Sequence, residues 1–356
     1  MMKILHSADW HLDAPLTGRS DAEAQFLRQE LRKVPAKIAE CAKRENCQLL
    51  LLAGDLFDGA YTKESYRAVY EALKSVEIPV FIAPGNHDFC QPSSPYMAES
   101  WPENVHIFTK PTMESVYLEA LDCTVYGAGY EAMDCGALLE GFKADGAGKW
   151  QIGVLHGEAA ASSSYCPITT QQVRLSGLQY LALGHIHKGG LFTAGKTLCA
   201  WPGCPMGRGY DEPGQKGALI VTVGEETASR FVPLDAPQFY DLETDVTDTP
   251  ENALSALLPA VGNDHFYRVT FTGSSEAIVL DRVAAAFSRF PNLVLRDKTT
   301  PPVDVWGTAD EDSFEGMYFR LLRSALEAAD PQTQKRIRLA AEISRQILDG
   351  QEVTLP

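Results

Sequence analysis

Short groups of metal-ligand residues recur in a fixed order along the first part of this 356-residue chain. Each group combines carboxylate, amide or imidazole side chains, and each lies where a run of apolar residues ends. Mixed oxygen and imidazole ligands suit first-row divalent cations, and ligands gathered from several strand ends are typical of hydrolytic two-metal centres. The groups are Asp9-Trp10-His11, Gly54-Asp55-Leu56-Phe57-Asp58, Gly85-Asn86-His87-Asp88, His156 in Val154-Leu155-His156-Gly157-Glu158, and Gly184-His185-Ile186-His187.

The spacing within these groups lets several side chains reach the same cation. In the first and last groups the polar residues stand two apart, and residues i and i+2 of an extended chain point to the same side. Asp55 has two carboxylate oxygens, which can bridge two cations about 3.5–4 Å apart. We therefore expect a dinuclear metal centre in which one aspartate is shared. The expected ligands are Asp9, His11, Asp55, Asn86, His156, His185 and His187.

Each group has an ordinary alternative when it is taken alone. An Asp-x-His sequence occurs by chance in many proteins, and a Gly-Asp pair after a strand is usually a turn. A single histidine at a strand end is more often a satisfied core or surface side chain than a ligand. The dinuclear interpretation therefore depends on the joint order of the groups, their spacing and their shared placement at strand ends.

The segments between these groups alternate between apolar strands and amphipathic helices. Strands are predicted at 3–9, 48–53 and 79–83, with helices at 21–45 and 63–76. This alternation predicts βαβ units in a sheet that is covered on both faces. Further along the chain strands predominate, which favours a sheet sandwich with flanking helices over one doubly wound sheet. The later strands are predicted at 105–108, 116–121, 123–128, 151–156, 180–184, 197–201, 217–223 and 229–234.

A change in composition near Pro233-Leu234-Asp235-Ala236-Pro237 predicts the end of a first domain. We expect three parts, namely a large domain over 1–235, a small α/β domain over 236–300 and a helical hairpin over 301–356. This division agrees with the usual size of protein domains. The small domain is predicted from strands 239–247, 265–273 and 291–296 with helices 250–260 and 275–289, and the hairpin from helices 313–329 and 332–348.

Composition and charge limit the class of protein. No apolar run approaches the ~18 residues of a membrane-spanning helix, and the N-terminus runs directly into the first group, without room for a signal peptide. The eight cysteines form no Cys-x-x-Cys pair. We therefore expect a cytoplasmic protein without a membrane segment, a disulfide framework or a thiolate zinc site. The net charge of −16 would repel nucleic acid unless a basic patch, the metals or a partner subunit compensates.

In this order, the groups resemble the calcineurin-like metallophosphoesterase superfamily, whose pattern is D-x-H, G-D-x-x-D, G-N-H-D/E, a lone H and G-H-x-H. Every element of the pattern is present, and the resemblance covers residues 4–235. It implies an α/β fold of the α+β type, a four-layer β-sandwich flanked by helices. It also implies that a small C-terminal α/β cap and a helical tail follow this phosphoesterase domain.

The resemblance implies a role for each of these residues. Asp55 would bridge the two cations. His87 is similar to the family's non-ligand histidine, which protonates the leaving oxygen or steadies the phosphate, and Asp58 matches the residue that orients it. The other residues divide into one set for the first cation, Asp9, His11 and His187, and one set for the second, Asn86, His156 and His185.

Within the superfamily, three stretches resemble the SbcD/YhaO-like branch of DNA repair exonucleases. The resemblance implies hydrolysis of DNA phosphodiester bonds, with exonuclease or endonuclease action left open. Relatives in this branch work with an SbcC-like coiled-coil ATPase that docks on C-terminal helices, and a homodimer also stays open. The stretches are His6–Leu16, Tyr180–Lys188 and Pro202–Glu212.

Several assignments stay open in the sequence. The ligand set suits Mn²⁺, with Fe, Zn²⁺ or Mg²⁺ as alternatives. A small-molecule phosphodiesterase or phosphomonoesterase is the alternative function, which the acidic charge favours. A non-catalytic scaffold is disfavoured because every motif position is filled. Arg208 is a candidate phosphate contact or a surface salt bridge, and Trp10 is expected to pack beneath the site.

The two C-terminal helices carry basic residues that have two interpretations. A solvated helix face is the ordinary one. Docking of an acidic partner or steering of DNA is the alternative. The residues are Arg320, Arg323, Lys335, Arg336, Arg338 and Arg345.

Overall fold

The computed structural model describes residues 1–301, 304–350 and 353. The chain divides into two compact units, one of residues 1–241 with 264–268 and one of residues 242–263 with 269–356. The division into 1–235, 236–300 and 301–356 stays a prediction, and its last segment lies partly outside the described residues. All the residues of the expected metal centre belong to the first unit.

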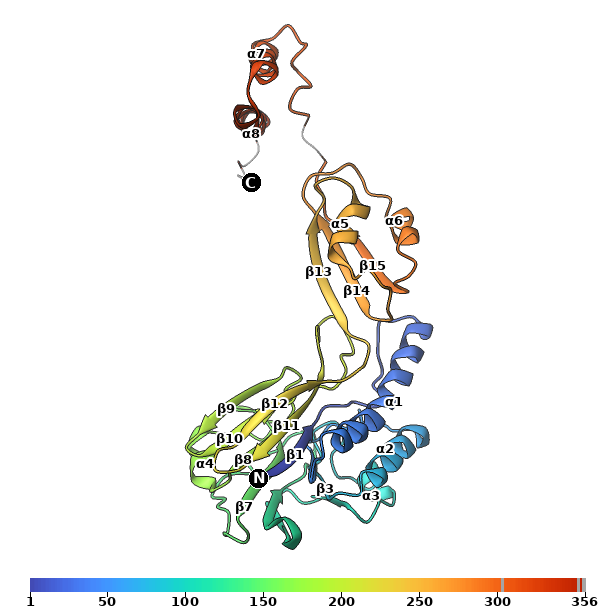
Figure 1. The fold of residues 1–356 in the computed structure, drawn as a ribbon, viewed down its shortest axis with the longest axis vertical. Coiled ribbons are helices and arrows are strands. Elements are labelled where there is room, and N and C mark those ends of the chain that lie inside the picture. The colour runs from blue at the N-terminus through green and yellow to red at the C-terminus, as the bar shows by residue number, and fades with distance from the viewer. Residues whose placement is uncertain (302–303, 351–352, 354–356) are drawn as a thin grey trace. The chain divides into compact units, whose positions relative to one another are not determined.

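The first unit contains two six-stranded sheets (Figure 1). In the first sheet, the four strands that come early in the chain run parallel, and the last two strands pair antiparallel. The spatial order is β12 (Ala228–Pro233), β11 (Gly217–Val223), β1 (Met2–Ser7), β2 (Leu49–Leu52), β3 (Val80–Ile82) and β4 (Val105–Ile107).

The second sheet has a parallel centre and two antiparallel edges. Its four inner strands run parallel, and the first and last strands of its spatial order pair antiparallel with their neighbours. The spatial order is β5 (Glu114–Leu118), β6 (Cys123–Gly127), β7 (Trp150–His156), β8 (Tyr180–Gly184), β10 (Thr197–Trp201) and β9 (Gly190–Ala194).

Helices α1 (Asp21–Arg44) and α2 (Lys63–Ser75) connect the first three parallel strands of the first sheet. Both begin at a capping side chain. Ser20 accepts a hydrogen bond from the backbone N–H of Glu23, and Thr62 accepts one from that of Ser65. Each helix buries one apolar stripe against the sheet, as the periodicity predicts. In α1 this stripe includes Leu27, Leu31, Val34 and Ile38.

Apolar side chains fill the spaces between four layers. In β2, Leu50 and Leu52 pack against α1 and α2, whereas Leu49 and Leu51 pack into the core between the two sheets. A further cluster covers the outer face of the second sheet and includes Val173 of helix α4 (Thr170–Ser176). The four-layer arrangement of helices and sheets, with mixed α/β character, confirms the predicted fold class.

Three short elements differ from the predictions. Strand β9 was not expected, because most of its residues are exposed and show no apolar alternation. The predicted strand 116–121 is instead β5 followed by a 3₁₀ turn at Glu119–Leu121, which ends at Asp122 in the left-handed region (φ 48°). Aspartate tolerates that conformation better than most residues do. Helix α3 (Pro95–Ala98) is a single turn without a periodic pattern.

The second unit contains most of a three-stranded sheet, with β14 (Phe266–Thr272) between β13 (Phe239–Asp245) and β15 (Asn292–Asp297). Helix α5 (Pro250–Leu257) agrees with its prediction, whereas α6 covers only Leu280–Ala286 of the predicted 275–289. Helices α7 (Phe314–Ala328) and α8 (Pro331–Leu348) complete the unit. None of the helices in the described residues is long and apolar enough to cross a membrane.

A small core holds the last two helices together. Phe319 of α7 and Ala341 of α8 are fully buried within it. Arg345 is buried too, and it forms hydrogen bonds with the side chains of Glu315 and Thr308. Arg345 therefore does not belong to a solvated basic face, in contrast to the ordinary interpretation of the basic residues in these helices.

Candidate metal centre

The five groups of polar residues converge at one end of the two sheets. The carboxyl ends of β1, β2 and β3 in the first sheet lead into Asp9, Asp55 and Asn86. In the second sheet β7 ends at His156, and β8 leads into His185. Loops after parallel strands are free to diverge, so this edge is where an α/β fold places ligands. The strand-end placement assumed from the sequence is therefore what the structure shows.

The backbone turns sharply at these strand ends. Asp9, His11, Asp55 and His185 have positive φ angles of 56°, 47°, 53° and 89°. Non-glycine residues in this region carry strain, and such residues concentrate at functional sites. The turns are tied together, because the Asp9 N–H donates to the Gly54 carbonyl (3.0 Å) and the His11 N–H donates to the Asp55 carbonyl (2.9 Å).

One cluster of candidate ligands contains Asp9, His11 and His187. The Nε2 atoms of His11 and His187 are 3.0 Å apart. Nδ1 of His187 lies 2.6 Å from Oε1 of Glu212, so this nitrogen carries the proton and the Nε2 lone pair faces His11. Three potential ligand atoms from two sheets and two loops therefore point at one small volume.

A second cluster contains Asn86, His156 and His185. Oδ1 of Asn86 lies 2.9 Å from Nε2 of His156 and 3.2 Å from Nδ1 of His185. Nδ1 of His156 donates to the carbonyl of Ala53 at 2.8 Å, which fixes the ring and directs its Nε2 toward Asn86. This cluster supplies one amide oxygen and two imidazole nitrogens.

Asp55 lies between the two clusters. Its Oδ2 is 3.3 Å from Nε2 of His156 and 3.7 Å from Nε2 of His11, so one oxygen faces a residue of each cluster. Its Oδ1 accepts a hydrogen bond from the backbone N–H of His87 at 2.9 Å. This position is compatible with a carboxylate that two cations share.

The electrostatics of this buried set favour cations. Burial raises the pKa of Asp9 to about 6 and lowers the pKa of both His11 and His185 to about 4. The two imidazoles are therefore neutral and have lone pairs available. Burial lowers the pKa of His156, but the charge of Asp55 outweighs it and raises that pKa to about 9. A cation bound between His156 and Asp55 would therefore displace a proton.

An unsatisfied oxygen shows that this ligand set fits metal ions. Within the described part of the chain, Oδ2 of Asp9 is buried and has no hydrogen-bond partner. A buried carboxylate oxygen without a partner is costly, and a coordinated cation removes that cost. Together with the imidazole and amide donors, this oxygen fits two divalent ions that share Asp55.

His87 lies beside the two clusters. With 41% of its side chain accessible, it is more exposed than any histidine of the clusters. Its Nδ1 is 2.6 Å from Oδ1 of Asp58, as the proposed orienting role requires. That hydrogen bond is the main reason why the pKa of His87 lies above its ordinary value, although burial opposes it. The His87 ring packs edge-on against the His11 ring, with centroids 4.8 Å apart.

Arg208 borders the same site. Its guanidinium lies 3.8 Å from Oδ2 of Asp58 and 2.9 Å from Oε1 of Glu212. Glu212 thus holds both Arg208 and His187, and it is largely buried. Trp10 is fully buried, and its indole N–H donates to Oγ of Ser7 at 2.8 Å, so it packs in the protein interior.

The sequence did not reveal three residues that support the site. Glu212 is the last residue of Pro202–Glu212, a stretch that was noted only for its family resemblance. Its distance from His187 along the chain gave no sign that the two side chains meet. Tyr165 packs against His185 from a loop without a motif, with ring centroids 4.7 Å apart and ring planes tilted by 31°. Asp88 was visible in its group, but its role was not, because its carboxylate contacts backbone rather than other motif side chains.

Asp88 holds the turn that carries Asp55. Its carboxylate accepts hydrogen bonds from the N–H groups of Leu56 (2.7 Å) and Gly85 (2.8 Å) and from the Tyr96 hydroxyl (2.5 Å). We expect Asp88→Ala to lower the free energy of unfolding by about 3 kcal/mol or more, because buried donors lose their acceptor. Urea unfolding of the chelator-treated protein measures this loss.

The control for Asp88 is an exposed aspartate. Asp134 lies on the surface, so Asp134→Ala is expected to change the free energy of unfolding by less than about 0.5 kcal/mol. Equal unfolding midpoints for the two variants would show that the Asp88 carboxylate does not support the turn.

Gly85 is packed directly against candidate ligands. A Cβ atom at this position would lie 2.2 Å from Oδ1 of Asp55 and 2.8 Å from Nδ1 of His156. We therefore expect Gly85→Ala to displace these side chains and to weaken cation binding by about 10–100-fold. Titration with Mn²⁺ in competition with a chelating dye measures the affinity.

Gly136 provides the matched control, because a Cβ atom there would meet no atom within 4 Å. Gly136→Ala should bind Mn²⁺ as the parent chain does. Unchanged Mn²⁺ affinity in Gly85→Ala as well would mean that the candidate ligands at this edge can move without weakening cation binding.

A buried set of imidazole, carboxylate and amide ligands at the strand ends of a four-layer α/β sandwich defines a metal-dependent hydrolase class. The sequence profile of the family described as calcineurin-like phosphoesterase matches residues 2–189. This match covers more than half of the chain, and the chain belongs to that family.

The chain is similar to relatives from the SbcD/YhaO-like branch of the superfamily. YhaO of Bacillus subtilis, described as an uncharacterised metallophosphoesterase, is 33% identical over 241 residues, which are 62% of this chain and 57% of YhaO. The SbcD component of the SbcCD nuclease of Staphylococcus epidermidis is 28% identical over 120 residues, which are 32% of this chain and 30% of that protein. The matched region thus spans little more than half the length of YhaO and less of SbcD.

Among solved structures, a dimetal phosphatase from Danio rerio aligns with 64% of this chain and 98% of its own, at 12% identity and a TM-score of 0.42.

Proposed function

We propose that this chain hydrolyses DNA phosphodiester bonds with the aid of two divalent cations. The observation that supports the proposal is the pair of candidate ligand clusters that the Asp55 carboxylate faces, in a chain similar to YhaO and to the SbcD component of the SbcCD nuclease. Phosphoester hydrolysis follows from the family, and DNA as the substrate is the proposed part.

Two sets of residues in the centre would each hold one cation. When bound, two divalent ions lower the pKa of water and neutralise the charge that develops on phosphate oxygens. The mixed imidazole, carboxylate and amide donors favour Mn²⁺, with Fe, Zn²⁺ or Mg²⁺ as alternatives. Asp9, His11 and His187 would hold one ion and Asn86, His156 and His185 the other, with Asp55 shared.

His87 would supply the proton for the leaving group. Cleavage of a phosphodiester expels a sugar alkoxide, which is a poor leaving group, so proton transfer to that oxygen accelerates the reaction. The Nδ1 atom of His87 is held by Asp58 at 2.6 Å, which leaves Nε2 to face the substrate. Asp58 thus positions the ring and stabilises its protonated form.

Arg208 is the proposed contact for a phosphate oxygen. Its guanidinium is anchored by Glu212 at 2.9 Å and lies within 3.8 Å of Asp58, close to the proposed proton donor. A guanidinium held in this way can bind an anion without first losing the freedom of a long side chain.

A partner protein would help to bring an acidic chain to DNA. The net charge of −16 opposes binding of a phosphate polymer. Helix α7 leaves Phe314, Met317 and Leu321 exposed, which suits a docking face for an SbcC-like coiled-coil ATPase. Such an assembly would work in the cytoplasm, and a homodimer of this chain is compatible with it.

The second candidate function is hydrolysis of a small phosphodiester or phosphomonoester. The acidic charge is the observation that favours it, because a small substrate does not need an extended basic surface. The same ligand clusters, His87 and Arg208 would carry out this reaction.

Three substrates distinguish the two candidates. The Mn²⁺-loaded protein is incubated with labelled duplex DNA, labelled single-stranded DNA and a nitrophenyl phosphodiester. Cleavage of either DNA supports the nuclease. Turnover of the small diester alone, with both DNAs intact even when a coiled-coil ATPase partner is present, contradicts it and supports the alternative.

A further inference from the structure

Two cysteines from separate loops lie side by side in the first unit. Cys135 and Cys166 belong to segments that form a short parallel bridge, in which Cys135 pairs with Tyr165. The Cys166 N–H donates to the Cys135 carbonyl at 2.9 Å, and the Cys135 N–H donates to the Ser164 carbonyl at 2.8 Å. Each thiol also affects the pKa of the other. These backbone contacts hold the two cysteines next to one another.

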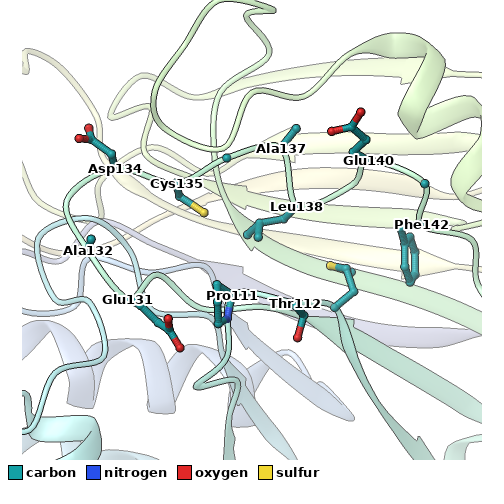
Figure 2. Close-up of a pocket in the computed structure, with 13 residues that line it drawn as sticks. Pro111, Thr112, Glu131, Ala132, Asp134, Cys135, Ala137, Leu138, Glu140 and Phe142 are labelled. Carbon is teal, nitrogen blue, oxygen red and sulfur yellow. The ribbon is translucent and has the colours of Figure 1, made fainter.

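The two thiols differ in their access to solvent. Cys166 is fully buried, whereas Cys135 is partly exposed and lines a surface pocket of about 620 Å³. Figure 2 shows Cys135 in the wall of this pocket, with the carboxylates of Glu131, Asp134 and Glu140 around it. These acidic side chains disfavour anionic reagents, while a small neutral molecule can reach the Cys135 sulfur.

We propose that Cys135 and Cys166 form a reversible disulfide when the protein meets a peroxide. Redox-sensitive cysteines are typically accessible and placed next to a second thiol that resolves the first oxidation product. Cys135 has the accessible position, and Cys166 has the position of the resolving thiol. Reactive disulfides in reducing compartments are usually of this transient kind.

The chemistry balances with hydrogen peroxide as the oxidant. The Cys135 thiolate attacks one peroxide oxygen, the O–O bond breaks, and the departing hydroxide takes up a proton to become water. Cys135 is then a sulfenic acid. Cys166 gives up its proton and attacks the Cys135 sulfur, which forms the disulfide and releases the sulfenic oxygen as a second water. Two thiols are oxidised by one peroxide, and a dithiol reductant reverses the reaction.

The electrostatics agree with these two roles. The hydrogen bond from Cys166 is the main reason why the pKa of Cys135 lies below its ordinary value, although burial opposes it. The same hydrogen bond and burial hold the pKa of Cys166 well above its ordinary value. The thiolate, which is the nucleophile, therefore forms on the exposed member of the pair.

The pair lies close to the candidate metal centre. The ring of Tyr165, next to Cys166, packs against the His185 ring, with centroids 4.7 Å apart. Gly157, next to His156, packs so closely against Cys166 that a Cβ atom there would lie 3.2 Å from the sulfur. The pair therefore lies one residue away from groups that contact the candidate ligands.

The experiment follows the thiols of the full Mn²⁺-loaded chain. The reduced protein is treated with one equivalent of hydrogen peroxide, its free thiols are blocked by alkylation, and unreduced peptides are identified by mass spectrometry. The expected result is the loss of two of the eight thiols, one cross-link between the peptides of Cys135 and Cys166, and full recovery with a dithiol. Eight free thiols after treatment, or oxidation of Cys135 without a cross-link, would overturn the proposal.

Two variants and one internal control sharpen the result. Cys135→Ser should retain its seven remaining thiols, whereas Cys166→Ser should stop at a sulfenic acid on Cys135 that a cyclic dione traps. Cys41 and Cys47 are another neighbouring pair, but both are buried, and burial raises the pKa of Cys47 to about 12. Cross-linking of Cys41 to Cys47 at the same rate would show that peroxide oxidises cysteines unselectively. It would contradict the proposal that Cys135 and Cys166 are a specific redox pair. The wild-type peptides decide the question even if a variant fails to fold.

Discussion

Replacement of Asp55 by asparagine is expected to remove binding of two cations and to lower phosphoester turnover by at least about 10³-fold, since the metal ions contribute several kcal/mol to the transition state. An asparagine at this position would have the same shape but no charge. Only its amide oxygen could coordinate a metal, whereas both oxygens of the carboxylate can. In the structure, the Asp55 carboxylate faces residues of both clusters, at 3.3 Å from His156 and 3.7 Å from His11. Metal content by mass spectrometry and the rate on a nitrophenyl diester measure the two effects.

Asp122 allows a matched control for this change. Both aspartates adopt a positive φ, 53° at Asp55 and 48° at Asp122, and asparagine tolerates this region as well as aspartate does. Asp122→Asn should therefore retain both cations and full turnover. Two tightly bound ions in Asp55→Asn would show that the clusters do not share this carboxylate.

Replacement of His87 by alanine should retain both cations but lower turnover of a DNA or alkyl phosphodiester by about 10²–10⁴-fold, the usual contribution of a positioned proton donor. His87 is not part of the two clusters that share Asp55, and its ring is held by Asp58 at 2.6 Å. The loss should be small for a nitrophenyl diester, because nitrophenolate leaves without a proton. Rates on a series of leaving groups of increasing pKa measure the difference.

The leaving-group series also separates two roles of His87. A histidine that only steadies the phosphate would lose the same factor for every leaving group, which would contradict the proton-donor assignment. His106 is an exposed histidine away from the clusters, and His106→Ala should leave all the rates unchanged. Loss of one cation in His87→Ala would instead show that His87 acts as a ligand.

Much of the fold could be predicted because its central strands are buried on both faces. The four leucines of β2 form an apolar run that is typical of a strand between two cores, and the amphipathic helices on either side indicate the connections. Prediction failed where burial is weak. Strand β9 is largely exposed and pairs as an edge strand with β10, and local sequence carries no signal of that pairing.

The candidate site was predictable for a similar reason. Cations require particular donor atoms, so the residue types at the strand ends were informative even before the strands were placed in space. The supporting contacts were not predictable, because they join residues that have no common pattern. Oε1 of Glu212 lies 2.6 Å from Nδ1 of His187, but no fixed spacing in the sequence links the two residues. Asp88 acts through backbone N–H groups, which every residue except proline has and which therefore leave no pattern in the sequence.

The pairing of β1 sets a minimum size for any fragment that could be made of this protein. Residues 4–7 of β1 pair with β2 on one side, but residues 2–6 pair with β11 on the other. A fragment cut at the end of the family match would lack β11 and would leave β1 as a long apolar edge, which invites aggregation. A soluble catalytic fragment should therefore extend through β12 to Pro233 at least.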